Sequence, residues 1–167
     1  MGALDGLDVR LEGAGGEIVE TRSRARTAFS GWRPNLYWDD LDMAYFANYA
    51  FWNYFTLPRL LMNPAIDWTE TGLGRLRAIF PESIPTHSRV QEFQFDRETG
   101  RLRQHNYTVE IMSRLATAAN VVLAHSEQDG LAFPSRREVS PQKPGGGALG
   151  WPLLLWIDVH AFRVVGA

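Results

Sequence analysis

The 167-residue sequence contains no cysteine. Disulfide bonds, thiol catalysis and thiolate metal sites are therefore excluded for this chain. Neither sign of charge is in large excess, because the formal net charge is only -2. A nearly neutral chain gives no general reason to expect nucleic acid or an anionic membrane as partner. The sequence thus predicts a protein that binds neither.

Long uninterrupted apolar runs are missing as well. The most apolar segment, residues 41–62, contains Asp42 and Arg59, which a membrane span would not tolerate easily. Residues 1–16 lack the apolar centre of a signal peptide. With 45% apolar and 22% charged residues, the composition is that of a globular protein. We therefore expect one soluble, cytoplasmic domain spanning residues 1–167.

A very aromatic helix is the clearest local prediction. Asp39 or Asp40 can cap its N-terminus, because a carboxylate accepts hydrogen bonds from the free backbone N–H groups there. The apolar periodicity then predicts a helix over residues 40–57, which Pro58 weakens. Apolar side chains cover nearly its whole circumference, so we expect burial on more than one side.

The rest of the chain alternates with the period of β-strands. Strands are predicted over residues 8–12, 17–21, 75–80, 89–95, 102–111, 121–126, 131–139 and 153–165, with residues 116–119 as a linker. Turns are predicted around Gly100 and at Asp129-Gly130. The predicted fold class is α+β and mainly β, a curved antiparallel meander sheet that wraps as a half-barrel around the helix. A complete small barrel is the alternative.

Five segments carry a resemblance to a known group of proteins. They are YFANYAFWNY at 45–54, the run from Phe80-Pro81 to Thr86-His87-Ser88-Arg89, RQHNY at 103–107, DGLAFPSRR at 129–137 and WIDV at 156–159. Together they resemble a group of bacterial hypothetical proteins. The architecture that this resemblance implies is similar to the LolA/LolB type of lipoprotein carrier, a lipocalin-like half-barrel with an apolar pocket.

The predicted hairpin over residues 87–111 offers the first candidate catalytic groups. If Phe95 lies opposite Leu102, counting back places His87 opposite Glu110, with Arg89 on the same face. If that face meets water, these are ordinary surface charges. If it lines a cavity, His87 and Glu110 form an acid/base pair and Arg89 binds an anion.

A second arrangement of the same hairpin points its other face inward. His105 and Tyr107 would then lie at the pocket edge, with Glu92 opposite His105. A histidine held by a carboxylate has a tuned pKa, and Tyr107 could donate a proton. A one-residue slip in register would exchange the two faces.

Asp158 is the remaining candidate catalytic residue. It lies in an apolar strand, where a buried carboxylate needs a partner. In the structural interpretation that partner is an arginine such as Arg136. In the functional interpretation Asp158 orients His125 or His160. Each of the candidate ligand-binding residues has an aromatic side chain that could stack on a flat ligand. They are Tyr45, Tyr49, Trp52, Phe93, His125 and Trp156. The basic run over residues 22–26 is predicted to be a solvated loop.

Three classes of function remain open. The first is a pocket protein that binds a hydrophobic or aromatic small molecule between helix and sheet. The second is an acid/base enzyme without a cofactor, an isomerase, cyclase or lyase. The third is a protein–protein interaction module or homodimer. The four histidines do not have zinc-site spacing, and no phosphate-binding loop is present, so neither a metal nor a cofactor is expected.

Overall fold

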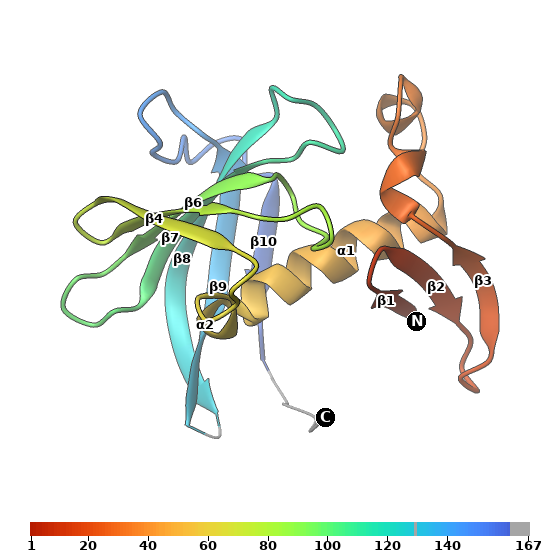
Figure 1. Ribbon diagram of the computed structural model, residues 1–167, viewed down its shortest axis with the longest axis horizontal. Helices are drawn as coiled ribbons and strands as arrows, with labels where there is room; N and C mark the ends of the chain where they lie inside the picture. Colours follow the sequence, from red (N-terminus) through yellow and green to blue (C-terminus); the bar gives the residue numbers. More distant parts are fainter. Residues whose placement is uncertain (129, 161–167) are drawn as a thin grey trace. The chain divides into compact units, whose positions relative to one another are not determined.

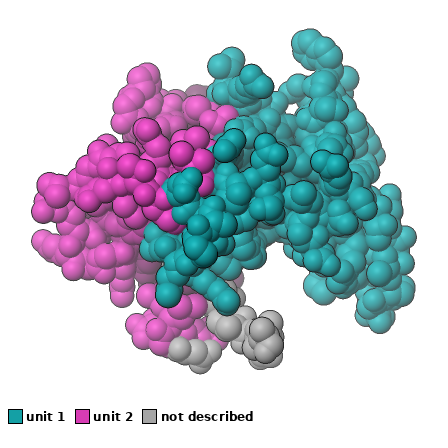
Figure 2. Space-filling view, in the orientation of Figure 1, with its two compact units in different colours: residues 1–67, 80–89, 109–115 teal, residues 68–79, 90–108, 116–167 magenta. Residues whose placement is uncertain are grey.

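The computed structural model describes residues 1–128 and 130–160 (Figure 1). It comprises two compact units (Figure 2). Unit 1 contains residues 1–67, 80–89 and 109–115, and unit 2 contains residues 68–79, 90–108 and the chain from residue 116 onward. The segments of the two units alternate along the sequence, so neither unit is one continuous stretch of chain.

Unit 1 combines a small sheet with short helices and one long helix. Its elements are β1 (Gly2–Asp5), β2 (Asp8–Glu12), β3 (Ile18–Arg22), the 3-10 helices η1 (Ala25–Ala28) and η2 (Arg33–Asn35), α1 (Asp40–Phe55) and α2 (Leu57–Leu60). The three strands are antiparallel in the order β1-β2-β3. The predicted hairpin over residues 8–21 is therefore confirmed, whereas β1 was not predicted.

The N-terminus of α1 is held by a network of four charged residues. Asp39 is the N-cap, and its side chain and that of Asp42 form a reciprocal capping box. Arg22 and Arg33 each form ion pairs with both carboxylates, at 2.6 to 2.9 Å. The hydrogen bond from Arg22 lowers the pKa of Asp39 to about 2.

Burial along α1 follows one broad face. Its buried residues are Leu41, Asp42, Tyr45, Tyr49, Ala50, Asn53 and Tyr54. On the opposite side Met43, Phe51 and Trp52 remain 41% to 53% exposed. The helix packs closely on β1, since a Cβ atom at Gly2 would lie 2.8 Å from that of Ala44. Burial thus covers a wide face of the helix but not its whole circumference.

Unit 2 is a seven-stranded antiparallel meander. Its strands are β4 (Asp67–Gly72), β5 (Arg75–Ile79), β6 (Val90–Phe95), β7 (Leu102–Thr108), β8 (Thr117–Gln128), β9 (Leu131–Pro141) and β10 (Leu155–Asp158). They lie side by side in chain order, from β4 in yellow to β10 in blue (Figure 1). The order is open, with β4 and β10 at the edges. The predicted mainly-β fold with a meander sheet and one long aromatic helix is confirmed.

Several strands differ from their predicted boundaries, most of all β8 and β10. The predicted linker over residues 116–119 is instead the start of β8, where Ala118 and Ala119 are fully buried. The predicted last strand is observed only as β10, and residues 161–165 lie outside the described residues. Asp129 of the predicted turn also lies outside them, while its neighbour Gly130 has the positive φ of 76° that this turn needs.

The register of the β6–β7 hairpin corrects the sequence-based count. Phe95 does lie opposite Leu102, but the register shifts between Gln94 and Phe95. Phe93 therefore lies opposite His105 rather than Gln104. Because an extra residue on one strand moves every later side chain to the other face, the predicted assignment of faces is wrong from this point onward.

Among the described residues, no helix is long and apolar enough to cross a membrane.

Candidate functional site

A cleft of about 480 Å³ lies within unit 1. Its apolar lining consists of Leu7, Tyr45, Phe80, Pro81, Ile84 and Pro85. Its charged lining consists of Arg24, Arg26, Arg89, Glu82 and Glu110, and two threonines, Thr27 and Thr86, complete it. The cleft is thus an apolar hollow with charged groups of both signs.

Tyr45 connects this cleft to the buried face of α1. The residue is fully buried, and its hydroxyl oxygen has no hydrogen-bond partner among the residues that the structure describes. Burial raises the pKa of this hydroxyl, and the nearby charge of Arg26 acts in the opposite direction. Buried hydroxyl groups are normally hydrogen-bonded, and Arg26 is the polar neighbour that interacts with this one. Tyr45 thus places a buried polar group within an apolar lining.

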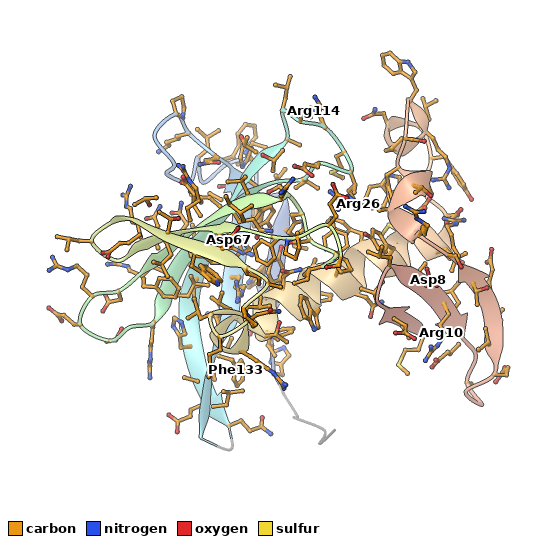
Figure 3. All side chains as sticks on the ribbon, viewed as in Figure 1. Asp8, Arg10, Arg26, Asp67, Arg114 and Phe133 are labelled. Atoms are coloured by element: carbon orange, nitrogen blue, oxygen red, sulfur yellow. The ribbon has the colours of Figure 1, made fainter. Side chains whose placement is uncertain are left out.

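Arg26 joins three segments of unit 1 around the cleft. It belongs to η1 (Figure 3), and its guanidinium group donates to the backbone oxygen of Thr86 at 2.7 Å and to the carboxylate of Glu110 at 2.8 Å. The backbone N–H of Glu110 in turn donates to the carbonyl of His87. This arginine therefore fixes η1 against the loop 81–86 and the segment 109–115.

Arg24 reaches the cleft from an unusual backbone conformation. Its φ is 48°, in the left-handed region that residues with a Cβ atom rarely adopt. Its backbone N–H donates to the side chain of Asp8 at 2.8 Å, and the N–H of Ala25 donates to the carbonyl of Leu7. These bonds tie the bend at Arg24 to the turn between β1 and β2.

His87 lies deep in unit 1, between two tyrosines of α1. Its Nε2 is 2.9 Å from the hydroxyl oxygen of Tyr54, and its Nδ1 is 3.3 Å from that of Tyr49. Burial, with a smaller contribution from the charge of Arg26, lowers the pKa of His87 to about 3. The imidazole is therefore neutral at physiological pH.

Asn53 attaches the loop 81–86 to α1. Its amide nitrogen donates to the carbonyl of Pro85 at 3.0 Å and to that of Tyr49 at 2.7 Å. Its amide oxygen accepts a hydrogen bond from the hydroxyl of Thr86 at 3.3 Å. Because Pro85 and Thr86 line the cleft, this buried asparagine holds part of the cleft in place.

A second, smaller hollow of about 350 Å³ lies next to the same loop. Ile84 and Pro85 line both hollows. Trp52 and Asn48 of α1 contribute to the second hollow. Tyr45 and Trp52, seven residues apart on one helix, therefore face two neighbouring spaces rather than one.

The cleft brings together three of the predicted site residues, Tyr45, Arg89 and Glu110. The predicted pair of His87 and Glu110 has different side-chain partners, tyrosines for the first and Arg26 for the second. Both residues lie beyond the strands, since β6 begins at Val90 and β7 ends at Thr108, and only their backbones are joined, by the bond from the N–H of Glu110 to the carbonyl of His87.

The other predicted groups lie in unit 2. His105 is buried, with its ring stacked on that of Phe93 at a centroid distance of 4.2 Å and hydrogen-bonded to Gln91. Tyr107 contacts the same histidine ring. Glu92 lies opposite Asn106 and forms an ion pair with Arg77, so the predicted pairing of Glu92 with His105 is wrong.

The remaining three predicted residues lie towards the β10 edge of that sheet. Asp158 forms an ion pair with Arg136 at 3.2 Å on the surface. The prediction that an arginine such as Arg136 pairs with this carboxylate is confirmed. Trp156 is 61% exposed. His125 of β8 has a buried Nε2 without a hydrogen-bond partner in the described residues, and burial lowers its pKa. None of these three lines the cleft of unit 1.

Arg24 and Arg26 of the basic run are cleft-lining residues that sequence reasoning missed. The prediction of a solvated loop is wrong for Arg22 and Arg26, which form specific ion pairs. Their alternation at positions 22, 24 and 26 was visible in the sequence. Their partners, Asp42 and Glu110, are too distant along the chain for spacing alone to reveal them.

Within residues 1–128 and 130–160, no three histidine, aspartate or glutamate side chains gather as a metal site would require. Compared with protein-family models, with curated proteins and with solved structures, the chain shows no match in any of the three.

Proposed function

We propose that this protein binds a small molecule with an apolar, aromatic or aliphatic body in the cleft of unit 1. The observation that carries the proposal is the cleft itself, about 480 Å³ of mainly apolar lining that includes the buried side chain of Tyr45. Small-molecule sites typically enclose about 300–1,000 Å³ and combine apolar walls with a few polar groups that orient the ligand.

Binding is favoured over acid/base catalysis by the electrostatics of the buried groups. A general acid or base works best when its pKa lies near the operating pH. Burial here moves the pKa values away from neutrality, downward to about 3 for His87 and upward for Tyr45 and Tyr49. Glu110 is paired with Arg26. These groups are suited to shaping and orienting rather than to proton transfer.

The test is isothermal titration of the full chain with neutral apolar probes, 1-naphthylacetamide and octanamide. Thr27 is exposed and lines the cleft, so Thr27→Trp fills the space without replacing a core residue. Thr21→Trp places the same ring on an exposed position of β3 as the matched control. The proposal predicts saturable 1:1 binding that Thr27→Trp abolishes and Thr21→Trp preserves.

The opposite pattern would overturn the proposal. If no probe binds saturably, or if Thr27→Trp binds as tightly as the unaltered chain, the cleft is not a ligand site. Circular dichroism of both variants establishes that any loss of binding does not come from unfolding.

A further inference from the structure

Two guanidinium groups at the cleft are uncommitted. Arg26 is engaged with Glu110 and with the carbonyl of Thr86. The side chains of Arg24 and Arg89 line the same cleft, and neither forms an ion pair or hydrogen bond with any residue that the structure describes. Guanidinium groups bind carboxylates through paired, charge-assisted hydrogen bonds. The cleft therefore offers two free donors of the type that recognises an anion.

The backbone at Arg24 supports a role beyond solvation. Within the described residues it is the only position other than glycine with a positive φ. Such a conformation costs free energy and persists only where surrounding bonds maintain it, as the bond from its N–H to Asp8 does here. The side chain of the residue in this conformation lines the cleft.

Positive charge also reaches the floor of the cleft. The charge of Arg26 lowers the pKa of three buried groups. At Tyr45 and Tyr49 it opposes the effect of burial, and at His87 it adds to that effect. The charge of Arg26 thus acts on three separate buried groups of unit 1, although Glu110 opposes it at Tyr49. An anion at the cleft would be attracted by this arginine, and the Tyr45 hydroxyl could donate a hydrogen bond to it.

We infer that the ligand is an amphipathic monocarboxylate, whose carboxylate binds Arg24 and Arg89 and whose apolar body packs on Tyr45, Phe80 and Ile84. This inference rests on the proposed binding function and adds the chemical class of the ligand to it. The apolar side chains come from the same lining as the arginines. One molecule with an acidic end and an apolar body therefore satisfies both parts of the cleft.

The balance of charge selects a monoanion over a dianion. Three arginines line the cleft against two glutamates, Glu82 and Glu110, which leaves one net positive charge. A carboxylate neutralises this charge. A phosphate monoester would bring a second negative charge close to the two glutamates, where like charges repel.

The experiment compares matched probes on one apolar body: 1-naphthylacetate, its neutral amide 1-naphthylacetamide, and 1-naphthyl phosphate. Octanoate and octanamide repeat the comparison with an aliphatic body. Titration calorimetry on the full chain gives each Kd at low and high salt. The variants are Arg89→Gln and Arg24→Gly, the latter because glycine adopts the positive φ without strain. Arg114→Gln, an exposed residue of unit 1 outside the cleft, makes the same change in net charge (Figure 3).

We expect each carboxylate to bind roughly tenfold more tightly than its amide, an advantage that falls with added salt. Arg89→Gln and Arg24→Gly should remove most of this advantage and weaken carboxylate binding far more than amide binding, while Arg114→Gln keeps the advantage. If the amides bind as tightly as the acids, the inference is overturned and the binding function stands. If the phosphate binds most tightly, the assignment to a monocarboxylate is overturned. If neither member of any pair binds, both the inference and the proposed function fail.

Discussion

The hydroxyl oxygen of Tyr54 lies 2.9 Å from Nε2 of His87, in the interior of unit 1. The other ring nitrogen, Nδ1, lies 3.3 Å from the hydroxyl of Tyr49. A neutral imidazole has one donor and one acceptor nitrogen, so it can satisfy two hydroxyl groups in this way. The arrangement stabilises the neutral histidine, in agreement with its lowered pKa of about 3.

The first prediction concerns stability in mild acid. His87 has a folded-state pKa of about 3, below its ordinary value of 6.5. As the pH falls below about 6.5, the unfolded chain binds a proton at this histidine and the folded chain does not. The histidine should therefore remove about 2 kcal/mol from the free energy of unfolding between pH 7 and pH 5.

Urea unfolding at both pH values, followed by tryptophan fluorescence, measures this loss. In His87→Gln the contribution from this site should disappear, whereas His160→Gln, at an exposed histidine, should keep it. Equal pH dependence in the native chain and in His87→Gln would show that the buried histidine is not the group responsible.

The second prediction compares the two tyrosines. Tyr54→Phe should lower the free energy of unfolding by about 1–2 kcal/mol, because it removes the shorter hydrogen bond to a buried nitrogen. Tyr49→Phe should cost less, since its hydroxyl lies farther from the ring. Tyr37→Phe, 64% exposed, is the control. Chemical denaturation ranks the three variants, and a larger cost for Tyr49→Phe than for Tyr54→Phe would contradict the assignment.

How far the fold follows from the sequence is clearest in α1. Its start at Asp40 and its cap at Asp39 were predictable, because both depend on neighbours three residues apart. The register between β6 and β7 could not be predicted, since the irregularity between Gln94 and Phe95 depends on packing across the sheet. β4 was missed because its sequence, DWTETG, is largely polar, as an exposed edge strand allows.

The site was less predictable than the fold. Tyr45, Arg89 and Glu110 were identified by residue type and do meet at the cleft. Arg26 was assigned to solvent because a charge run usually is solvated. Its real partners are 60 and 84 residues away along the chain, at Thr86 and Glu110. Contacts over such separations follow from the tertiary fold, which local patterns do not encode.

The third prediction concerns the charged network at the start of α1. The side chain of Asp42 is fully buried and forms ion pairs with Arg22 and Arg33, both at 2.6 Å. Asp42→Ala leaves both guanidinium groups without this partner, so it should lower the free energy of unfolding by about 3 kcal/mol or more. Asp40→Ala, at an exposed position of the same turn, should change it by less than about 0.5 kcal/mol. Equal effects of the two substitutions, measured by thermal or urea unfolding, would refute the importance of the network.

The fourth prediction concerns the loop 142–150 of unit 2. Asn106 and Gln104 of β7 both donate to the carbonyl of Gly146, at 2.7 and 2.6 Å. Within the loop, the N–H of Lys143 donates to Gly147 and that of Gly146 to Lys143. Asn106→Ala should loosen the loop and speed hydrogen exchange at these two amides, because one of the two anchors is lost.

Arg103→Ala, an exposed position on the same strand, is the matched control for this loop. NMR-detected exchange reads out each amide separately. Unchanged protection at Lys143 and Gly146 in Asn106→Ala would show that the loop maintains its conformation without β7.

The last prediction connects the helix to the cleft through two asparagines of α1. Asn48 and Asn53 each donate to the carbonyl four residues earlier, at 2.8 and 2.7 Å. Only Asn53 adds hydrogen bonds to Pro85 and Thr86 of the cleft lining. Asn53→Ala should therefore lower the free energy of unfolding by about 1–3 kcal/mol, and Asn48→Ala by less than about 1 kcal/mol.

The same pair separates the role of the loop 81–86 in binding from its role in stability. If Asn53 holds Pro85 and Thr86 in the geometry of the cleft, Asn53→Ala should also weaken the binding of 1-naphthylacetate at a temperature where the variant is fully folded. Asn48→Ala should leave that affinity unchanged, because its side-chain bond remains within α1. Calorimetric titration of both variants decides the matter. A loss of stability in Asn53→Ala without any loss of affinity would mean that the cleft keeps its shape when the loop is detached from the helix, and that the asparagine serves the fold alone.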